Sequence, residues 1–340
     1  MNDMSHPLLQ VSAGLARPWL VADIGGTNAR FGWVAQGSLG VEHVSTLPVA
    51  AHSNPALAAQ AYLDALSRQL GADYAPPRAA ALAVATAVGS DQVTLTNSGW
   101  SFSRQSLRAG LALDELLVLN DFEALALSLP RLGAAQLRPI GGPRTGAAAS
   151  AMAVIGPGTG LGVAGILPTA AGWVAVPGEG GHASLAPADD FESQLLAAAR
   201  SEFPHVSAER FLSGIGLPVL HRAVAAVMGM ATPVLATETI VERGLDRTDA
   251  VCDRTLDAFC ALLGSFAGST ALVLGARGGV FIGGGIVPRL GERFFASAFR
   301  ERFEAKGRFQ EYLRAIPTSL ITDTLVALTG ASFALEQQVR

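Results

Sequence analysis

The sequence predicts an α/β protein with a small domain, a large domain and a cleft between them. Residues 20–34 and residues 152–166 each read as a strand, a glycine-containing turn and a second strand. Elsewhere, apolar runs of strand length alternate with helical patterns, which is typical of sheets covered by helices on both faces. Two such hairpins can face each other across a cleft and hold one polyphosphate from both sides.

Composition narrows the class of protein. The chain has 340 residues, 50% of them hydrophobic, which is enough for one large or two moderate domains. A net charge of −4 with 15% charged residues and no basic cluster argues against a nucleic-acid partner. The first residues lack a basic segment followed by a long apolar core, so we expect no signal peptide, no membrane anchor and a cytoplasmic protein. Residues 1–18 read as a tail too short for a DNA-binding helix-turn-helix.

The first hairpin contains the segment Asp23-Ile-Gly-Gly-Thr-Asn28 at its turn. Paired glycines permit positive φ and let backbone N–H groups approach phosphate oxygens. Thr27 adds a hydroxyl donor, and Asp23 can hold Mg²⁺ directly or through water. The alternative is an ordinary hairpin, since Gly-Gly is a common turn sequence. The second hairpin, with the turn Gly158-Thr159-Gly160, favours the phosphate interpretation.

Neither turn matches the more common nucleotide-binding loops. A Walker A loop requires Gly-Lys-Ser/Thr at the start of a helix, and no lysine stands near either turn. A dinucleotide fingerprint also requires a strand followed by a helix, whereas β-forming residues follow both turns.

The elements after the first hairpin follow in order. Apolar residues at helical spacing behind Ser-Asn-Pro predict an N-capped helix over 53–70, and the apolar run 78–88 predicts a buried strand. Residues 93–102 read as a strand and a turn. Residues 113–119 form a strand that ends in Asn120-Asp121 and continues as a helix. Strand carboxyl ends are the usual ligand edge of such sheets, and although one of these two residues can cap the helix, the other is then left over.

Three polar residues stand out in the second half of the chain. Glu179 and His182 lie in a glycine-rich turn whose flexible backbone allows close approach to a hydroxylated ligand, although a lone histidine is more often structural. Glu209 is a weaker candidate, since a glutamate beside an arginine is usually a solvated ion pair. Residues 278–289 contain an apolar strand that ends in three glycines, on which an adenine or ribose could rest.

The remaining segments read as structural elements. The uncharged run 258–276 predicts a buried interdomain helix, because its glycines, serines and threonine lower its hydrophobicity below that of a membrane span. Cys252 and Cys260 lie too far apart on one helix for a disulfide, and two cysteines cannot build a Cys-rich zinc site. Residues 322–338 predict a helix that contains Gly330 and returns to the first half of the chain.

The hairpin sequence resembles the phosphate loop of the actin, heat-shock ATPase and sugar kinase superfamily, and nearly the whole chain resembles the bacterial glucokinases of the hexokinase-like type. Seven motifs occur in that family's order and approximate spacing: Asp23-x-Gly-Gly-Thr-Asn-Ala-Arg30, Asn120-Asp-Phe122, Gly158-Thr-Gly-Leu-Gly162, Gly178-Glu-Gly-Gly-His182, Ser207-Ala-Glu-Arg210 with Leu212-Ser-Gly214, Gly279-Val-Phe-Ile282 with Gly284-Gly-Ile-Val-Pro-Arg289, and Lys306-Gly-Arg-Phe309. The chain departs from the family at Ala85-Thr-Ala-Val88, in place of a proline-containing turn, and at Asn97-Ser-Gly-Trp100.

This resemblance implies a two-lobed, actin-like (ribonuclease H-like) fold and ATP-dependent phosphorylation of glucose with Mg²⁺. The small domain would span about 1–130, completed by the helix of 322–340, and the large domain 131–321. The resemblance further implies a homodimer and, because the cysteine-rich motif of a related family is missing, no zinc. It implies the following roles: Asp121 as catalytic base; Asn120, Glu179, His182 and Glu209 as sugar ligands; Asp23, Gly25, Gly26, Thr27, Asn28, Gly158, Thr159 and Gly160 at the phosphates, with Asp23 at the metal; Gly284 and Gly285 near the adenosine.

Two other classes of protein remain as alternatives. A non-catalytic sugar sensor on this fold would keep the sugar ligands but needs a DNA-binding module, which residues 1–18 are too short to supply. An ATPase of the actin or chaperone type would keep both phosphate hairpins but has no need of the sugar ligands. Sugar-dependent release of ADP separates all three. The sequence leaves open the selectivity among hexoses and any phosphoryl donor other than ATP.

Overall fold

The computed structural model describes residues 17–338, apart from residues 39, 87, 96 and 97. Ala87 and Asn97, each of which belongs to one of the two family departures noted above, lie outside the described part. Residues 1–16 of the predicted tail lie outside it as well. The chain divides into two compact units. Unit 1 contains the described residues up to Arg131, Thr169–Trp173 and the described residues from Leu325 onward, and unit 2 contains Leu132–Pro168 and Val174–Thr324.

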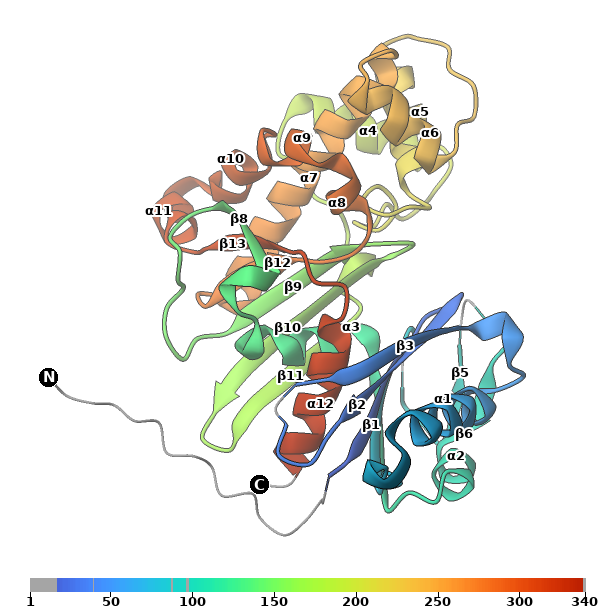
Figure 1. The fold of residues 1–340 in the computed structure, drawn as a ribbon. Helices are drawn as coiled ribbons and strands as arrows, with labels where there is room; N and C mark the ends of the chain where they lie inside the picture. Colours follow the sequence, from blue (N-terminus) through green and yellow to red (C-terminus); the bar gives the residue numbers. More distant parts are fainter. Residues whose placement is uncertain (1–16, 39, 87, 96–97, 339–340) are drawn as a thin grey trace, which may run out of the picture. The chain divides into compact units, whose positions relative to one another are not determined.

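Unit 1 is built on a five-stranded sheet in the order β3-β2-β1-β4-β7 (Figure 1). Its elements are β1 (Trp19–Ile24), β2 (Asn28–Val34), β3 (Glu42–Pro48), α1 (Pro55–Leu70), β4 (Ala79–Val84), β5 (Gln92–Thr94), β6 (Ser101–Ser103), α2 (Arg104–Gly110), β7 (Glu115–Asn120), α3 (Asp121–Ser128) and α12 (Val326–Gln338). Strands β1 and β2 pair antiparallel, as the sequence predicts, and β1, β4 and β7 run parallel. Strand β4 is buried along its whole length, because helices cover both faces of the sheet.

The two faces of this sheet have separate apolar cores. One core includes Phe31, Tyr62 and Leu82 and contains the inner face of α1, whose N-cap is Asn54 with its Oδ1 3.0 Å from Leu57 N. The other core joins β1 to α12 through Val21 and Leu328. The predicted C-terminal helix therefore does return to the first half of the chain, although it begins four residues later than 322.

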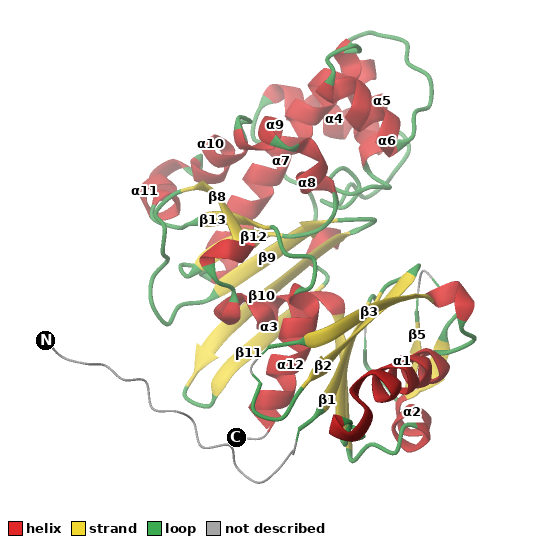
Figure 2. Cartoon of the chain, in the orientation of Figure 1, coloured by secondary structure: helices red, strands yellow, loops and turns green. Residues whose placement is uncertain are grey.

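Unit 2 is built on a six-stranded sheet in the order β11-β10-β9-β12-β13-β8. Its elements are β8 (Leu137–Gly141), β9 (Met152–Pro157), β10 (Leu161–Thr169), β11 (Gly172–Gly178), α4 (Asp190–Arg200), α5 (Leu217–Val227), α6 (Thr237–Leu245), α7 (Ala250–Leu274), β12 (Gly279–Ile282), α8 (Ile286–Leu290), α9 (Glu292–Phe295), α10 (Phe299–Glu304), α11 (Gln310–Arg314) and β13 (Thr318–Ile321). Strands β9 and β10 form the second predicted hairpin, and β9, β12 and β13 run parallel. Each unit thus has an antiparallel hairpin followed by parallel strands, with helices packed on the sheet (Figure 2).

Helix α7 is the central helix of unit 2. It is long and apolar enough to cross a membrane by length and composition alone, and 61% of its most apolar window is buried in the structure. Its residues Leu256, Phe259 and Leu263 belong to the main core of unit 2, which agrees with the prediction of a buried helix. Cys252 and Cys260 are free and buried on this helix, also as predicted.

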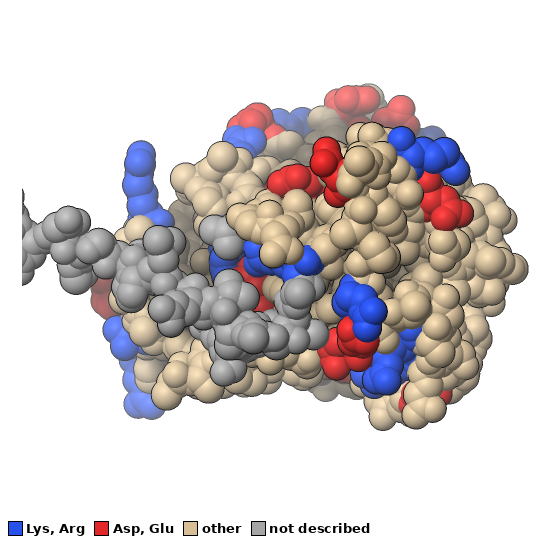
Figure 3. All heavy atoms as spheres, turned by 60° about the horizontal axis from the view of Figure 1, so that its bottom comes forward, with Lys and Arg blue, Asp and Glu red and all other residues tan. Residues whose placement is uncertain are grey.

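On the face shown in Figure 3, Lys and Arg side chains are interspersed with Asp and Glu.

Candidate active site

Unit 1 places two of the predicted site segments, the Asp23 hairpin and Asn120-Asp121, at one edge of its sheet. Because β1, β4 and β7 are parallel and in register, with Ile24 opposite Val84 and Val84 opposite Asn120, their carboxyl ends coincide. Asp23 stands near the end of β1, and Asn120-Asp121 stand at the end of β7 where α3 begins. This is the edge where sheets of this kind bind ligands.

The Asp23 carboxylate is largely buried and paired. Its Oδ2 accepts a hydrogen bond from Arg30 Nη1 at 3.1 Å. The two residues lie directly opposite each other on β1 and β2. Burial raises the pKa of Asp23, and the guanidinium of Arg30 opposes that rise. No role was predicted for Arg30 from the sequence. Its pairing with Asp23 could have been predicted, because residues seven apart around a three-residue turn face each other across a hairpin.

The turn between β1 and β2 leaves Thr27 and Asn28 exposed. Gly25 N donates to Asn28 O at 2.9 Å and closes the turn. Contrary to expectation, neither Gly25 nor Gly26 adopts positive φ, because this bond closes the hairpin without a left-handed residue. The glycines instead leave the backbone uncovered by side chains, since a Cβ on Gly25 would have only Asn28 O within 4 Å, at 3.6 Å.

The sequence left open which of Asn120 and Asp121 caps the helix and which is left over. Asn120 is the N-cap of α3, because its Oδ1 accepts from Phe122 N at 2.9 Å and Glu123 N at 3.3 Å. Its Nδ2 donates to Thr86 O at 3.2 Å. The segment that departs from the family's proline turn therefore supplies the carbonyl that orients Asn120.

Asp121 is the first residue of α3. Its Oδ1 accepts from Phe122 N at 2.9 Å, which orients the carboxylate. Burial raises the pKa of Asp121 to about 6, Phe122 N lowers it, and the negative charge of Asp23 raises it further. A carboxyl with this pKa is largely ionised at pH 7 and still a much stronger proton acceptor than an exposed aspartate, which are the properties required of a general base.

Unit 2 brings the second hairpin, predicted to bind phosphate, together with Glu209. Glu209 Oε2 accepts from Leu161 N at 2.9 Å, at the first residue of β10. A Cβ on Gly160 would lie 2.5 Å from the same carboxylate oxygen, so any side chain there would displace the Glu209 carboxylate from Leu161 N. Gly214 N donates to Gly158 O at 2.8 Å and fixes the other side of the turn. The solvated Glu-Arg pair considered for Glu209 is therefore wrong, because its carboxylate accepts from the backbone of the β9–β10 hairpin.

His182 and Glu179 belong to the same part of unit 2. His182 Nδ1 lies 3.9 Å from Glu209 Oε1, and Glu209 N donates to Gly181 O at 2.8 Å. Glu179 is exposed, and its carbonyl accepts from His182 N at 3.0 Å. His205, which received no role from the sequence, has its Nε2 3.0 Å from His182 O. The three predicted sugar ligands of unit 2 thus lie on the turn that contains Glu179 and His182 and on the segment at Glu209 that is hydrogen-bonded to this turn.

The glycine triplet after β12 lies beside the same hairpin. Gly283 N donates to Ile155 O at 2.8 Å and extends the parallel pairing of β12 with β9. Gly284 has φ +77°, and a Cβ there would lie 2.4 Å from Pro157 O, so only glycine fits. Gly285 is exposed, and a Cβ there would meet no atom within 4 Å, which leaves backbone open to a flat ligand group.

One other group in unit 2 has the residue types of a metal site. Ligand atoms of His221, Asp249 and Cys252 lie within 4.8 Å of one another. Asp249 Oδ1, however, accepts from Val251 N and Cys252 N as the N-cap of α7. We interpret this group as a helix cap with buried polar neighbours.

The fold defines a sugar kinase of the actin-like superfamily, and comparison with known proteins gives the family. The family model named Glucokinase matches residues 20–338. A glucokinase of Chromobacterium violaceum is 47% identical over 326 residues, covering 95% of this chain and 91% of the relative. The solved structure of a glucokinase from an Antarctic psychrotroph is 40% identical and superposes with a TM-score of 0.86, covering 94% of this chain and 98% of that one. The structure of a glucokinase from Balamuthia mandrillaris, at 19% identity and a TM-score of 0.73 over 95% and 94% of the chains, shares the fold.

The chain belongs to the glucokinase family.

Proposed function

We propose that this protein transfers the γ-phosphoryl group of ATP to the 6-hydroxyl of glucose, giving glucose 6-phosphate and ADP, the first step of glycolysis. The observation that carries the proposal is the Asp121 carboxylate, held at the start of α3 with a pKa of about 6 in a member of the glucokinase family. Phosphoryl transfer needs positioning of the two reactants, neutralisation of phosphate charge and a group that receives the proton of the attacking hydroxyl.

Asp121 is proposed as that proton acceptor. Its Oδ1 is occupied by Phe122 N, so Oδ2 is the oxygen proposed to face the 6-hydroxyl. The sugar oxygen attacks the γ-phosphorus as its proton passes to Oδ2, and the bond from phosphorus to the ADP oxygen breaks. Asn120, already fixed by its bonds to α3 and Thr86, is proposed to contact a second hydroxyl through its remaining amide hydrogen.

The polar groups of unit 2 are proposed to bind the rest of the sugar. Glu179 and Glu209 accept from sugar hydroxyls, and His182 both orients and contacts them. A site of paired polar groups discriminates strongly against sugars that leave a buried partner unpaired, by a factor of about 10⁴ in favourable cases. Both carboxylates and the imidazole lie on segments tied to the β9–β10 hairpin, so sugar and phosphate contacts share one support.

Backbone and oxygen donors are proposed to hold the nucleotide. The turns Gly25–Asn28 and Gly158–Gly160 offer N–H groups and the hydroxyls of Thr27 and Thr159 to phosphate oxygens, and Gly284 and Gly285 support the adenosine. The donor set near Asp23 fits Mg²⁺, which prefers carboxylate and hydroxyl oxygens and keeps several waters. Asp23 would hold the ion, directly or through water, and the ion would offset phosphate charge when bound.

Three further features belong to the proposal. The two units are proposed to be the small domain, 1–130 completed by 322–340, and the large domain, 131–321, which act together on one sugar and one ATP. We also propose that the protein works in the cytoplasm and as a homodimer, on the basis of the family.

Asp23→Ala is expected to weaken Mg²⁺-ATP use by about tenfold or more while leaving glucose binding nearly intact. The reason is that Asp23 lies at the phosphate hairpin, apart from the proposed sugar ligands, and its loss leaves Arg30 without its partner. Calorimetry with each ligand separately decides. Lost glucose affinity with normal nucleotide affinity would contradict the assignment.

Glu179→Gln is expected to raise the KM for glucose more than it lowers kcat. A hydroxyl contact made in both the ground state and the transition state affects binding more than the chemical step. Steady-state kinetics measure both constants, and Glu202→Gln, a change of another exposed carboxylate of unit 2, is the matched control that should leave both unchanged. A fall in kcat larger than that of Asp121→Asn would make Glu179 the candidate base.

The function itself is tested by a coupled assay across glucose, mannose, fructose and N-acetylglucosamine with ATP, ADP and polyphosphate. We expect ADP release that depends on glucose and ATP. Glucose binding without ADP release would favour the sugar sensor, and ADP release without sugar would favour the ATPase.

A further inference from the structure

Unit 2 contains a pocket whose lining includes none of the residues proposed to bind phosphate or sugar. It has a volume of about 310 Å³ and lies between β10, β11, the turn that follows β11, and α7. Its lining is mostly apolar, including Val163, Val176, Leu185, Phe266 and Leu274. A volume near 300 Å³ with few polar groups is at the lower end of the range of small-molecule sites.

The only lysine of the chain, Lys306, contacts two residues that line this pocket. Every other basic residue apart from the histidines is an arginine. Lys306 Nζ donates to Ser265 Oγ at 3.1 Å and to Ser269 Oγ at 3.0 Å, and both serines line the pocket. Lys306 makes no ion pair within 4.0 Å among the residues that the structure describes. Burial lowers the pKa of Lys306, the positive charge of Arg302 lowers it further, and the carboxylate of Glu192 opposes both effects.

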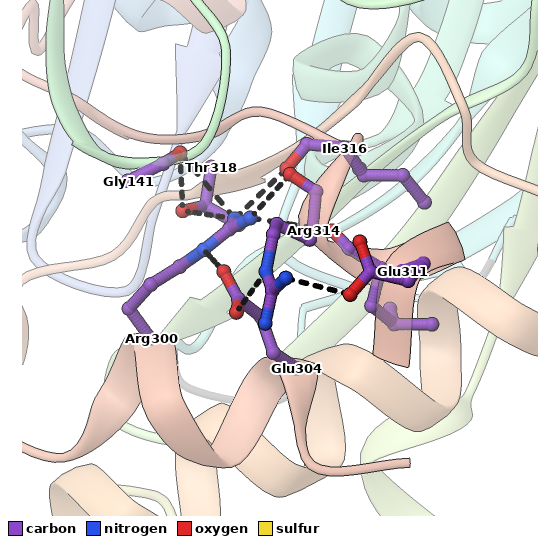
Figure 4. Close-up of polar contacts among 8 residues, drawn as sticks. Gly141, Arg300, Glu304, Glu311, Arg314, Ile316 and Thr318 are labelled. Carbon is purple, nitrogen blue, oxygen red and sulfur yellow. Dashed lines mark hydrogen bonds and ion pairs between the residues drawn. The ribbon is translucent and has the colours of Figure 1, made fainter. Parts of the chain in front are cut away.

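The fold holds Lys306 firmly against α7. A Cβ on Gly268 would lie 2.9 Å from Lys306 Cε, so the lysine stem rests where α7 has no side chain. Helix α10, which ends two residues before Lys306, is anchored by Arg300. This guanidinium donates to Ile316 O at 2.8 Å and to Glu304 Oε1 at 2.6 Å, and Arg314 extends the network to Glu311 (Figure 4). The motif Lys306-Gly-Arg-Phe309, to which the proposed reaction assigns no role, thus begins at a residue bonded to two serines of the pocket lining.

The hydrogen-bonding capacity of the serines indicates what the pocket can bind. Ser269 Oγ donates to Ser265 O, so its hydrogen is used within α7. Ser265 Oγ accepts from Lys306, and its own hydrogen makes no bond in the described part of the chain. A hydroxyl polarised by an ammonium group is a good donor to an anion. An apolar pocket with this donor at its wall matches a molecule that has an apolar body and one carboxylate.

We propose that this pocket binds a small amphipathic carboxylate, which the Ser265 hydroxyl, polarised by Lys306, recognises. The pocket also shares backbone with the proposed sugar ligands, because Gly178 and Gly180 flank Glu179 and Ala183 follows His182. An occupant supports the turn that carries these ligands, so it is expected to lower the KM for glucose. This second effect, unlike binding itself, rests on the proposed function.

Binding is tested by calorimetry with octanoate as the probe, in the absence of sugar and nucleotide. We expect wild type to bind one octanoate per chain. The affinity of Lys306→Met for octanoate, and the affinity of wild type for octan-1-ol, should each be at least tenfold weaker than that of wild type for octanoate. Ala186→Phe places a ring at the exposed rim of the pocket and should abolish binding, whereas Ala188→Phe, an exposed alanine in the same segment that does not line the pocket, should not. Reductive methylation with ¹³C-formaldehyde labels this single lysine, and its NMR signal should shift with octanoate.

Several results would overturn the proposal. Octanoate that fails to bind, or that binds Lys306→Met as well as wild type, removes the site. If wild type is a dimer that does not bind octanoate, and Ala186→Phe is a monomer, this face is assigned to a second copy of the chain instead. Glucose KM is measured separately with and without octanoate, in wild type and Ala186→Phe. Saturable octanoate binding in a protein without glucose phosphorylation would leave the pocket in place and contradict only the proposed function.

Discussion

Asp121→Asn should lower kcat for glucose phosphorylation by roughly 10² to 10⁴ while changing glucose affinity little. The amide oxygen can replace Oδ1 as the acceptor for Phe122 N, so the position of the side chain is kept. The amide cannot take a proton from the 6-hydroxyl. The loss therefore falls on the chemical step and not on binding.

The same substitution should stabilise the protein at pH 7. Burial raises the pKa of Asp121 from its ordinary value of 3.8 to about 6, so the folded protein binds this proton more tightly than the unfolded chain does. Ionisation of Asp121 between those pH values therefore lowers the free energy of unfolding as pH rises, and the cost is fully present above pH 6. Removing it should add about 1 to 3 kcal/mol. The loss of a charge at the helix N-terminus opposes this by about 0.3 to 1 kcal/mol, which is smaller.

Glu123→Gln is the matched control for the effect on kcat. Glu123 lies in the same first turn of α3, and burial raises its pKa as well. The Glu123→Gln substitution should leave kcat within about threefold of wild type. It changes a charge in the first turn of α3 that is away from the reacting atoms, so the geometry of the site is kept. Near-normal kcat for Asp121→Asn, measured in parallel by steady-state kinetics and thermal denaturation, would show that the base has been misassigned.

Gly330→Ala should cause the largest loss of stability of any single methyl addition in unit 1. A Cβ on Gly330 would lie 1.7 Å from Ala124 O, so α12 and α3 must separate by more than 1 Å to admit it. Overpacking costs about 1 to 3 kcal/mol and more against backbone, whereas the helix propensity gained over glycine is about 1 kcal/mol. The net effect is destabilisation of about 2 kcal/mol or more.

The substitution should also lower kcat, by roughly tenfold to a hundredfold, since Ala124 lies one turn from Asp121 and a shift of about 1 Å in a catalytic group is enough for such a loss. Ser332→Ala on the same helix is the control. Ser332 Oγ is buried with no hydrogen-bond partner in the described part of the chain, so its removal should be neutral or stabilising. Chemical denaturation and kinetics measure both variants. Wild-type stability and activity in Gly330→Ala would contradict the close packing of α12 on α3.

The elements that follow from local sequence are those the sequence predicted well. Both glycine-turn hairpins, the buried strand β4 and the helix that begins after Asn120-Asp121 have local patterns of residues that permit few other structures. The choice between Asn120 and Asp121 as the cap depended on geometry. Asparagine in extended backbone reaches Phe122 N and Glu123 N, which leaves Asp121 as the available carboxylate.

Contacts between distant segments could not be predicted in this way. The bond from Leu161 N to Glu209 spans 48 residues, and that from Asn120 to Thr86 spans 34 residues. The need for glycine at 330 comes from a helix in the first half of the chain. Positive φ was expected at Gly25 and Gly26, but it occurs at Gly284, where a neighbouring carbonyl excludes a side chain. Such requirements arise from tertiary packing, which no local pattern in a single sequence records.

The role of Asp121 is tested most directly by the pH dependence of a single turnover. Glucose 6-phosphate formed by excess enzyme with ATP and glucose is quenched on the millisecond scale between pH 5 and pH 8. We expect the rate constant of wild type to rise with pH and reach a plateau with an apparent pKa of about 6, because only the ionised carboxylate accepts the proton. The rate of Asp121→Asn should be low and independent of pH over this range. A wild-type profile that is flat, or one that Asp121→Asn retains, would contradict the assignment of Asp121 as the base.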